Sequence, residues 1–350
     1  MDVKNKQCII SGYEIERTIL ANQDLKQKKF RDFGFKAFQN IVASAKGFPI
    51  YMGGYDGSGK SEISIELQLQ LSELYGDKHV ILTGEVGQIE EIYLELYWKH
   101  GKKPYNKFDY YGNENLSYQS DEERALSRNF INAHFLVVDV LRIPEVFRFD
   151  DLTKEIKNTL NEGLTFESIS TISIDGVYEV TREDKPQTEQ QLEALLNKIY
   201  RYGQRESISV YMTTHVANKN GFLELEGGNK YPKPPTKYNW TMGMMWSRKG
   251  YQLLNVYRPT IKYDYYGNGD MCEPNECWIE NEKSKPKGLT LPGRARIFFD
   301  PFANRYYEMI NGEKMFSRAW WIEESDQVYA AADAMQPNMD FQNESDTAPF

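Results

Sequence analysis

The segment GGYDGSGKS, residues 53–61, has the composition of a loop that holds phosphate. Four of its residues fit the pattern G-x-x-x-x-G-K-S without a mismatch: Gly54, Gly59, Lys60 and Ser61. In such a loop, glycines let backbone N–H groups curl around the β-phosphate, the lysine reaches the β- and γ-phosphates, and the serine hydroxyl ligates Mg²⁺. The segment therefore predicts a site for ATP and Mg²⁺.

The flanking residues supply the expected context for this loop. An apolar run, GFPIYM, precedes it and an amphipathic run, EISIELQLQLSELYG, follows it, so a strand is expected before the loop and a helix after it. The helix would direct its positive N-terminus at the phosphates. The predicted ATP-binding residues of the loop are Gly54, Asp56, Gly57, Ser58, Gly59, Lys60 and Ser61. A glycine-rich turn with a solvated lysine is the alternative interpretation.

Phosphate chemistry also requires a carboxylate for the metal and a base for water. Asp175, at the end of the apolar run STISIDGV, is the first candidate for the magnesium shell beside Ser61. Asp139, at the end of HFLVVDV, holds an equivalent place, and the order of the strands in the sequence does not choose between them. Glu85 in VILTGEV is the candidate base, because it follows the strand expected to neighbour the P-loop strand; a helix-capping role is its alternative.

One histidine also falls at a strand end. His215 ends the run SISVYMTTHV, where it could contact the γ-phosphate or the loop that follows. A buried histidine with satisfied hydrogen bonds is the equally weighted alternative.

Short apolar strands alternate with long helical runs from residue 49 to about residue 217, which predicts a doubly wound, mostly parallel sheet. Residues 218–239 are rich in Gly, Pro, Asn and Lys and are expected to form a long surface loop. Strands of antiparallel character follow. We expect residues 1–45 to form a helical arm, 46–322 the α/β domain, and 323–350 an acidic, flexible tail.

Composition limits the class of protein. The chain has 350 residues, 40% of them hydrophobic, and a net charge of −9. No stretch approaches the roughly 20 apolar residues of a membrane helix, so a cytoplasmic protein without membrane contact is expected. The acidic total argues against nucleic acid unless basic residues gather locally. The tyrosines of KPYNKFDYYGNENLSY, residues 103–118, are compatible with base stacking or with packing.

The order of these motifs resembles the RecA-like motor of hexameric replicative helicases of the DnaB and Twinkle class. The resemblance covers residues 45–310 and includes YNWTMGMMWSRKGYQLLNVYR and the final hairpin FDPFANRYY. It implies a RecA-like P-loop core with C-terminal antiparallel strands, ATP bound at subunit interfaces, and a ring around single-stranded DNA. Such a ring gathers many copies of one basic loop at its axis, so its outer surface can stay acidic.

The resemblance also implies a role for individual residues. Glu85 becomes the general base, Asp175 the Walker B carboxylate, and His215 a γ-phosphate sensor that relays to the loop after it. Arg258, which ends QLLNVYR, falls among the ATP-binding residues. The lysines that would hold DNA phosphates are Lys219, Lys230, Lys233 and Lys237.

The sequence departs from the family pattern at the position of the trans-acting arginine. Where the family has Lys-x-Arg, this chain has Lys283, Ser284 and Lys285. A lysine supplies positive charge without the two-pronged geometry of a guanidinium. We expect Lys285 to act as this finger, with Arg294 and Arg296 as the alternatives.

The sequence thus predicts an ATP-dependent DNA helicase of replication. Primase or polymerase are expected partners, and a phage-encoded chain in a host cytoplasm would suit the small motor. The alternatives are a RecA-like recombinase or loader, and a DNA-binding ring that keeps the nucleotide pocket without turnover. A small-molecule kinase fits the basic loop and the antiparallel strands poorly.

Overall fold

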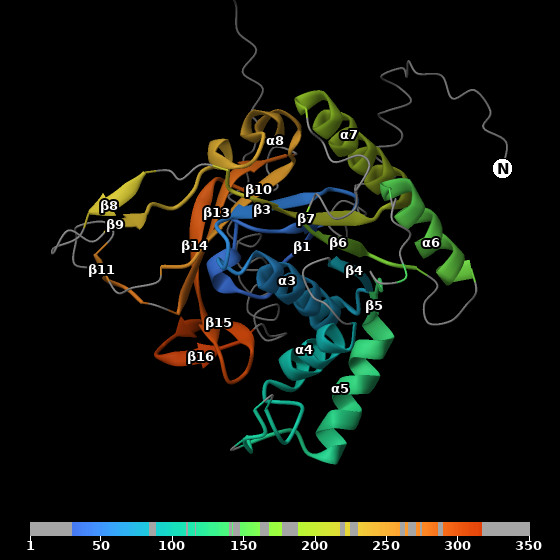
Figure 1. Ribbon diagram of the computed structural model, residues 1–350, viewed down its shortest axis with the longest axis vertical. Helices are drawn as coiled ribbons and strands as arrows, with labels where there is room; N and C mark the ends of the chain where they lie inside the picture. Colours follow the sequence, from blue (N-terminus) through green and yellow to red (C-terminus); the bar gives the residue numbers. More distant parts are fainter. Residues whose placement is uncertain are drawn as a thin grey trace, which may run out of the picture.

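A ten-stranded mixed sheet organises the computed structural model of the chain (Figure 1). The structure describes residues 30–83, 89–109, 111–115, 117–139, 142, 148–161, 168–176, 188–217, 221–224, 230–259, 263–264, 271–273, 275–285 and 290–316. Within this part of the chain, no helix is both long and apolar enough to cross a membrane.

The sheet has a parallel half and an antiparallel half, in the order β16-β15-β14-β13-β10-β3-β7-β6-β4-β5. The parallel strands are β3 (Ile50–Gly54), β4 (His79–Thr83), β5 (Phe135–Val137), β6 (Thr171–Asp175), β7 (Ser209–His215) and β10 (Gln252–Tyr257). The antiparallel strands are β13 (Glu276–Ser284), β14 (Gly293–Asp300), β15 (Arg305–Ile310) and β16 (Glu313–Met315). The predicted fold class, a mostly parallel sheet extended by C-terminal antiparallel strands, is confirmed.

The strand order corrects one expectation. β4, the strand before Glu85, does not neighbour the P-loop strand β3, because β7 and β6 lie between them. Each crossover helix can skip positions in the sheet, so succession along the chain does not fix adjacency. The carboxyl ends of parallel strands nevertheless share one edge, which places the residues after β3, β4, β6 and β7 along the same rim.

Helices cover both faces of the sheet (Figure 1). One face carries α3 (Lys60–Tyr75), α4 (Ile89–Gly101) and α5 (Asp121–His134), and the other carries α6 (Phe149–Asn161), α7 (Glu189–Glu206) and α8 (Gly243–Lys249). Side chains alternate along β3: Ile50 and Met52 pack toward α3, and Tyr51 packs toward α7 and α8. This two-residue period is that of a strand buried on both faces, and it explains the continuous apolar run in the sequence.

The N-terminal part of the described chain differs from the expected helical arm. Residues 30–45 form β1 (Phe30–Arg31), a 3-10 turn η1 (Lys36–Phe38) and β2 (Ser44–Ala45), with β1 and β2 paired. Phe33, Phe35 and Phe38 are fully buried against the α3 face of the sheet. This stretch therefore belongs to the core of the domain, and the arm and the acidic tail otherwise fall on residues 1–29 and 317–350, outside the described residues.

The expected loop at residues 218–239 contains short regular elements. β8 (Phe222–Glu224) pairs with β9 (Lys230–Pro232) as a small antiparallel hairpin, and η3 (Lys237–Asn239) leads into α8. A second small pair joins β11 (Tyr263–Asp264) and β12 (Met271–Cys272). Two- and three-residue strands are too short to give a readable alternation in the sequence.

Candidate nucleotide-binding site

The glycine-rich loop joins β3 to α3 as the sequence predicts. Gly57 and Gly59 adopt left-handed backbone angles, with φ of 71° and 87°, which glycine tolerates without a steric penalty. The Lys60 ammonium donates to the carbonyl oxygens of Gly54, at 3.2 Å, and Tyr55, at 3.0 Å. The lysine thus lies folded over the loop, where a phosphate would compete for its protons.

The glycines also make room for neighbouring groups. A Cβ on Gly59 would lie 2.7 Å from the Tyr306 hydroxyl, and a Cβ on Gly54 would lie 2.4 Å from the Val256 carbonyl. A Cβ on Gly53 would meet the Trp240 indole at 2.0 Å. These approaches are closer than real Cβ contacts, so the loop requires glycine for packing as well as for backbone conformation.

Asp175 and Ser61 line one cavity of about 270 Å³ at the carboxyl rim of the sheet. Asp175 is buried and accepts hydrogen bonds from the Thr213 hydroxyl, at 2.8 Å, and the Thr83 hydroxyl, at 3.3 Å. Two neighbouring strands therefore orient the carboxylate toward the start of α3. A hydroxyl and a carboxylate that share a small polar cavity fit the oxygen ligands of Mg²⁺, which keeps several of its waters.

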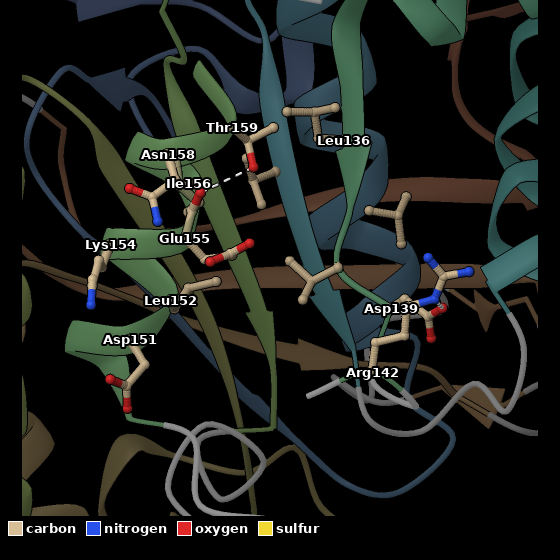
Figure 2. A pocket seen from close by; sticks show the side chains of 13 residues that line it. Leu136, Asp139, Arg142, Asp151, Leu152, Lys154, Glu155, Ile156, Asn158 and Thr159 are labelled. Carbon is tan, nitrogen blue, oxygen red and sulfur yellow. Dashed lines mark hydrogen bonds and ion pairs between the residues drawn. The ribbon is translucent and has the colours of Figure 1, made fainter. Parts of the chain in front are cut away.

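Asp139 lies elsewhere. It follows the edge strand β5 and forms an ion pair with Arg142, with 3.0 Å between nitrogen and oxygen. Figure 2 shows both side chains at a different cavity, of about 610 Å³, whose opposite wall is helix α6 with Leu152 and Ile156. Of the two aspartates, only Asp175 shares a cavity with Ser61 among the described residues.

His215 joins the P-loop to the segment after β7. In the sheet register it lies beside Gly54, and its Nδ1 lies 2.8 Å from the carboxylate of Asp56. Its carbonyl oxygen accepts hydrogen bonds from the backbone N–H and the hydroxyl of Thr241, at 3.1 and 3.3 Å. His215 therefore contacts the P-loop through its side chain and the far end of the 216–240 segment through its backbone.

Glu85 lies within residues 84–88, outside the described residues. The elements on either side of it are well defined. Thr83 ends β4 and bonds to Asp175, and α4 begins at Ile89. The position of Glu85 therefore depends on how α4 is held against α3.

A buried lysine that was not predicted from the sequence holds these two helices together. Lys99 of α4 is fully buried and donates to Glu62, next to Ser61 on α3, and to the Asn304 carbonyl at 2.8 Å. Glu95 lies 3.5 Å away. Burial alone would lower the pKa of Lys99, but the carboxylates of Glu62 and Glu95 outweigh it and raise that pKa. Burial raises the pKa of Glu95 to about 7, against the attraction of Lys99.

A second buried cation fixes α3 to the antiparallel half. The Arg305 guanidinium is fully buried, with its Nε 2.9 Å from both carboxylate oxygens of Glu66 and its Nη1 2.8 Å from Glu73. Glu62, Glu66 and Glu73 repeat at helical spacing on a helix that is otherwise buried. This row of acids on a buried helix was the available signal, because buried carboxylates need cationic partners.

Arg258 follows β10 and lies beside the P-loop of its own chain. Its Cδ would be 3.6 Å from a Cβ on Gly59, and its guanidinium lies 5.4 Å from the centre of the Phe299 ring. This placement is compatible with the predicted ATP-binding role.

The candidate finger residues occupy different surroundings. Ser284 pairs with Gln252, which pairs with Ile50, the first residue of β3, so Lys285 lies at the opposite edge of the sheet from the P-loop. Lys285 is exposed. Arg294 is ion-paired to Glu280 at 3.2 Å, and Arg296 to Glu276 at 2.6 Å. Lys285 can therefore reach an ATP only on a neighbouring subunit.

The predicted DNA-binding lysines are placed only in part. Lys219 and the side chain of Lys230 lie outside the described residues. Lys233 follows β9 and is partly exposed. Lys237 bonds to Glu282, with its ammonium 3.2 Å from that carbonyl and 3.5 Å from that carboxylate. A DNA phosphate would have to displace this contact.

No protein-family model matches the chain, and no curated protein matches it in sequence. Solved structures do match the fold. One, solved as an isolated ATPase domain, superimposes with a TM-score of 0.63 at 10% identity, covering 86% of this chain and 100% of that one. A DnaB-like replicative helicase, described with its primase interactions, gives a TM-score of 0.58 at 11% identity, covering 87% of this chain and 68% of that one. The chain therefore has the fold of the ATPase domain of DnaB-class replicative helicases.

Proposed function

We propose that the chain is an ATP-driven helicase that moves along single-stranded DNA as a ring, most simply a hexamer, during replication. The fold is that of a replicative helicase ATPase. The observation that carries the proposal is the shared cavity of Ser61 and Asp175, next to a P-loop whose lysine lies over the phosphate position. These groups form an ATP site without insertions.

The residues divide the work of hydrolysis. Ser61 and Asp175 would hold Mg²⁺, which neutralises charge on the β- and γ-phosphates. Lys60 would move from the carbonyls of the loop to the phosphate oxygens. Glu85 would accept a proton from the water that attacks the γ-phosphorus, while the bond to the β-phosphate oxygen breaks and ADP leaves. His215 would report the presence of the γ-phosphate through Asp56.

Catalysis would then be completed between subunits. Lys285 lies at the edge of the sheet opposite its own P-loop, and the arginines nearby are engaged by Glu276 and Glu280. A neighbour in a ring would bring Lys285 to the γ-phosphate. This arrangement makes ATP turnover depend on oligomerisation.

DNA contact is proposed for the basic segment between β7 and α8. Lys219, Lys230 and Lys233 would hold phosphates at the ring axis, with Lys237 contributing when released from Glu282. Primase or polymerase are proposed as partners, the DnaB-like structure having been determined with its primase interactions. Residues 1–29 are proposed as the arm that packs on a neighbour, so their removal should turn the ring into monomers by analytical ultracentrifugation.

Strand separation is the test of this proposal. We expect the protein to unwind a forked duplex with ATP, and neither Lys60→Ala nor a non-hydrolysable analogue to support unwinding. Filaments on DNA without unwinding would indicate a recombinase or loader instead. A ring that binds ATP and DNA but hydrolyses nothing would indicate a structural DNA-binding protein.

A further inference from the structure

Two tyrosine hydroxyls hold consecutive carbonyls at the base of the β8–β9 hairpin. The Tyr257 hydroxyl donates to Pro232 at 3.1 Å, and the Tyr55 hydroxyl donates to Lys233 at 2.9 Å. The Lys233 N–H in turn donates to Gly221 at 3.1 Å, which closes the hairpin at the same point. The hairpin projects from the body of the sheet (Figure 1), so these bonds fix its direction.

The two tyrosines differ in what else they contact. Tyr257 is the last residue of β10, whereas Tyr55 lies inside the P-loop, directly after Gly54. The carbonyl oxygen of Tyr55 accepts a hydrogen bond from the Lys60 ammonium. One residue therefore contacts the phosphate-binding lysine through its backbone and the basic segment through its side chain.

The far end of the segment is attached separately. Val216 and Trp240 form a bridge, and the Trp240 indole donates to Asn255 at 2.6 Å while packing on Gly53. These contacts anchor the C-terminal end of the segment to the sheet. A shift of Tyr55 would then move the hairpin relative to a fixed base.

We propose that Tyr55 is a positioning residue that couples phosphate occupancy of the P-loop to the orientation of the basic β8–β9 hairpin. When phosphates draw Lys60 away from the Tyr55 carbonyl, the loop changes its backbone and the Tyr55 hydroxyl carries the change to Lys233. This coupling rests on the proposed function for its consequence, since the hairpin is the proposed DNA contact. It is separate from the His215–Asp56 contact.

The test compares Tyr55→Phe with Tyr257→Phe in the full chain. Each removes one hydroxyl that holds the hairpin, but only the first comes from the P-loop. Amide hydrogen exchange of the peptide containing Lys233 is measured with and without a non-hydrolysable ATP analogue and Mg²⁺. The affinity for a labelled oligothymidylate is measured under the same two conditions, and the ratio of the two affinities reports the coupling.

In the wild type, the analogue should change both exchange and affinity. Tyr55→Phe should remove the exchange response and lower the affinity ratio about fivefold, as expected for one hydrogen bond, and Tyr257→Phe should keep both responses. The inference is overturned if Tyr55→Phe keeps the wild-type ratio within about twofold, or if Tyr257→Phe loses as much. It is also overturned if the wild-type exchange ignores the analogue.

The proposed function fails separately. If the wild type does not bind oligothymidylate, the DNA role is wrong, while the exchange response still supports or overturns the role of Tyr55.

Discussion

The two halves of the sheet use their polar residues differently. In the parallel half, Ser61, Asp175 and His215 converge on one rim around a cavity and the P-loop. In the antiparallel half, Arg294, Arg296 and Arg305 are each matched to a carboxylate of the same chain. Polar groups that face a cavity are available to a ligand, whereas those matched internally stabilise the fold. We therefore expect changes in the first half to remove activity and changes in the second to remove stability.

Arg305→Met should have the largest effect. It leaves the buried carboxylates of Glu66 and Glu73 without their cation, and breaking such a pair typically costs about 3–5 kcal/mol in the free energy of unfolding. Denaturant unfolding checks this value. The control is Lys314→Met, which breaks an exposed ion pair to Asp300 and should cost less than about 1 kcal/mol. Equal costs would contradict the structural role of Arg305.

Asp175→Asn should lower kcat for ATP at least about 100-fold, because a neutral amide holds Mg²⁺ poorly. The melting temperature should stay near that of the wild type. Asp139→Asn, at the end of the edge strand, serves as the matched control and should keep its turnover. If Asp139→Asn lost activity and Asp175→Asn kept it, the metal assignment would be reversed.

Acid should destabilise the protein through His79 in β4. Burial lowers the pKa of His79 from 6.5 to about 3. Between these values the unfolded chain binds a proton that the folded chain does not, so the free energy of unfolding falls as the pH drops below 6.5. The loss approaches about 1.4 kcal/mol per pH unit.

The measurement for His79 is the difference in stability between the wild type and His79→Gln from about pH 7 to about pH 5, a range that lies within the titration window of the unfolded imidazole. Asp32 and Glu95 have pKa values raised by burial to about 6 and about 7, so they act in the opposite sense and are common to both proteins. A difference that does not change with pH would exclude His79 as the source.

Lys285→Ala should show the smallest effect, a loss of about tenfold in kcat, since an exposed lysine stabilises charge less than an arginine finger. Lys285→Arg should equal or exceed the wild type. Arg296→Ala, which breaks the pair with Glu276, should lower stability before turnover. Intact turnover in Lys285→Ala together with loss in Arg294→Ala or Arg296→Ala would move the finger to an arginine.

The sequence predicted the parts of the fold that depend on local patterns. The P-loop between strand and helix follows from glycine spacing, and the change from parallel to antiparallel strands follows from the change in periodicity. The strand order was not predictable, because β7 and β6 enter between β3 and β4 through long crossovers. The core position of Phe33, Phe35 and Phe38 was missed because three-residue spacing also suits an amphipathic helix.

The candidate site shows the same division. Residues of the P-loop were identified from the sequence, since each one is required by local phosphate geometry. Lys99 and Arg305 were missed because their partners lie on α3, far from them in the sequence. A buried ion pair becomes visible only when tertiary packing brings its two charges together.

The rim of the parallel half is proposed to hydrolyse ATP in response to DNA. Steady-state ATP hydrolysis with and without single-stranded DNA, for the wild type and Lys60→Ala, examines this role without further assumptions. We expect a DNA-stimulated rate in the wild type that is absent from Lys60→Ala. A wild-type rate that equals the Lys60→Ala rate, with ATP still bound, would contradict the proposed role.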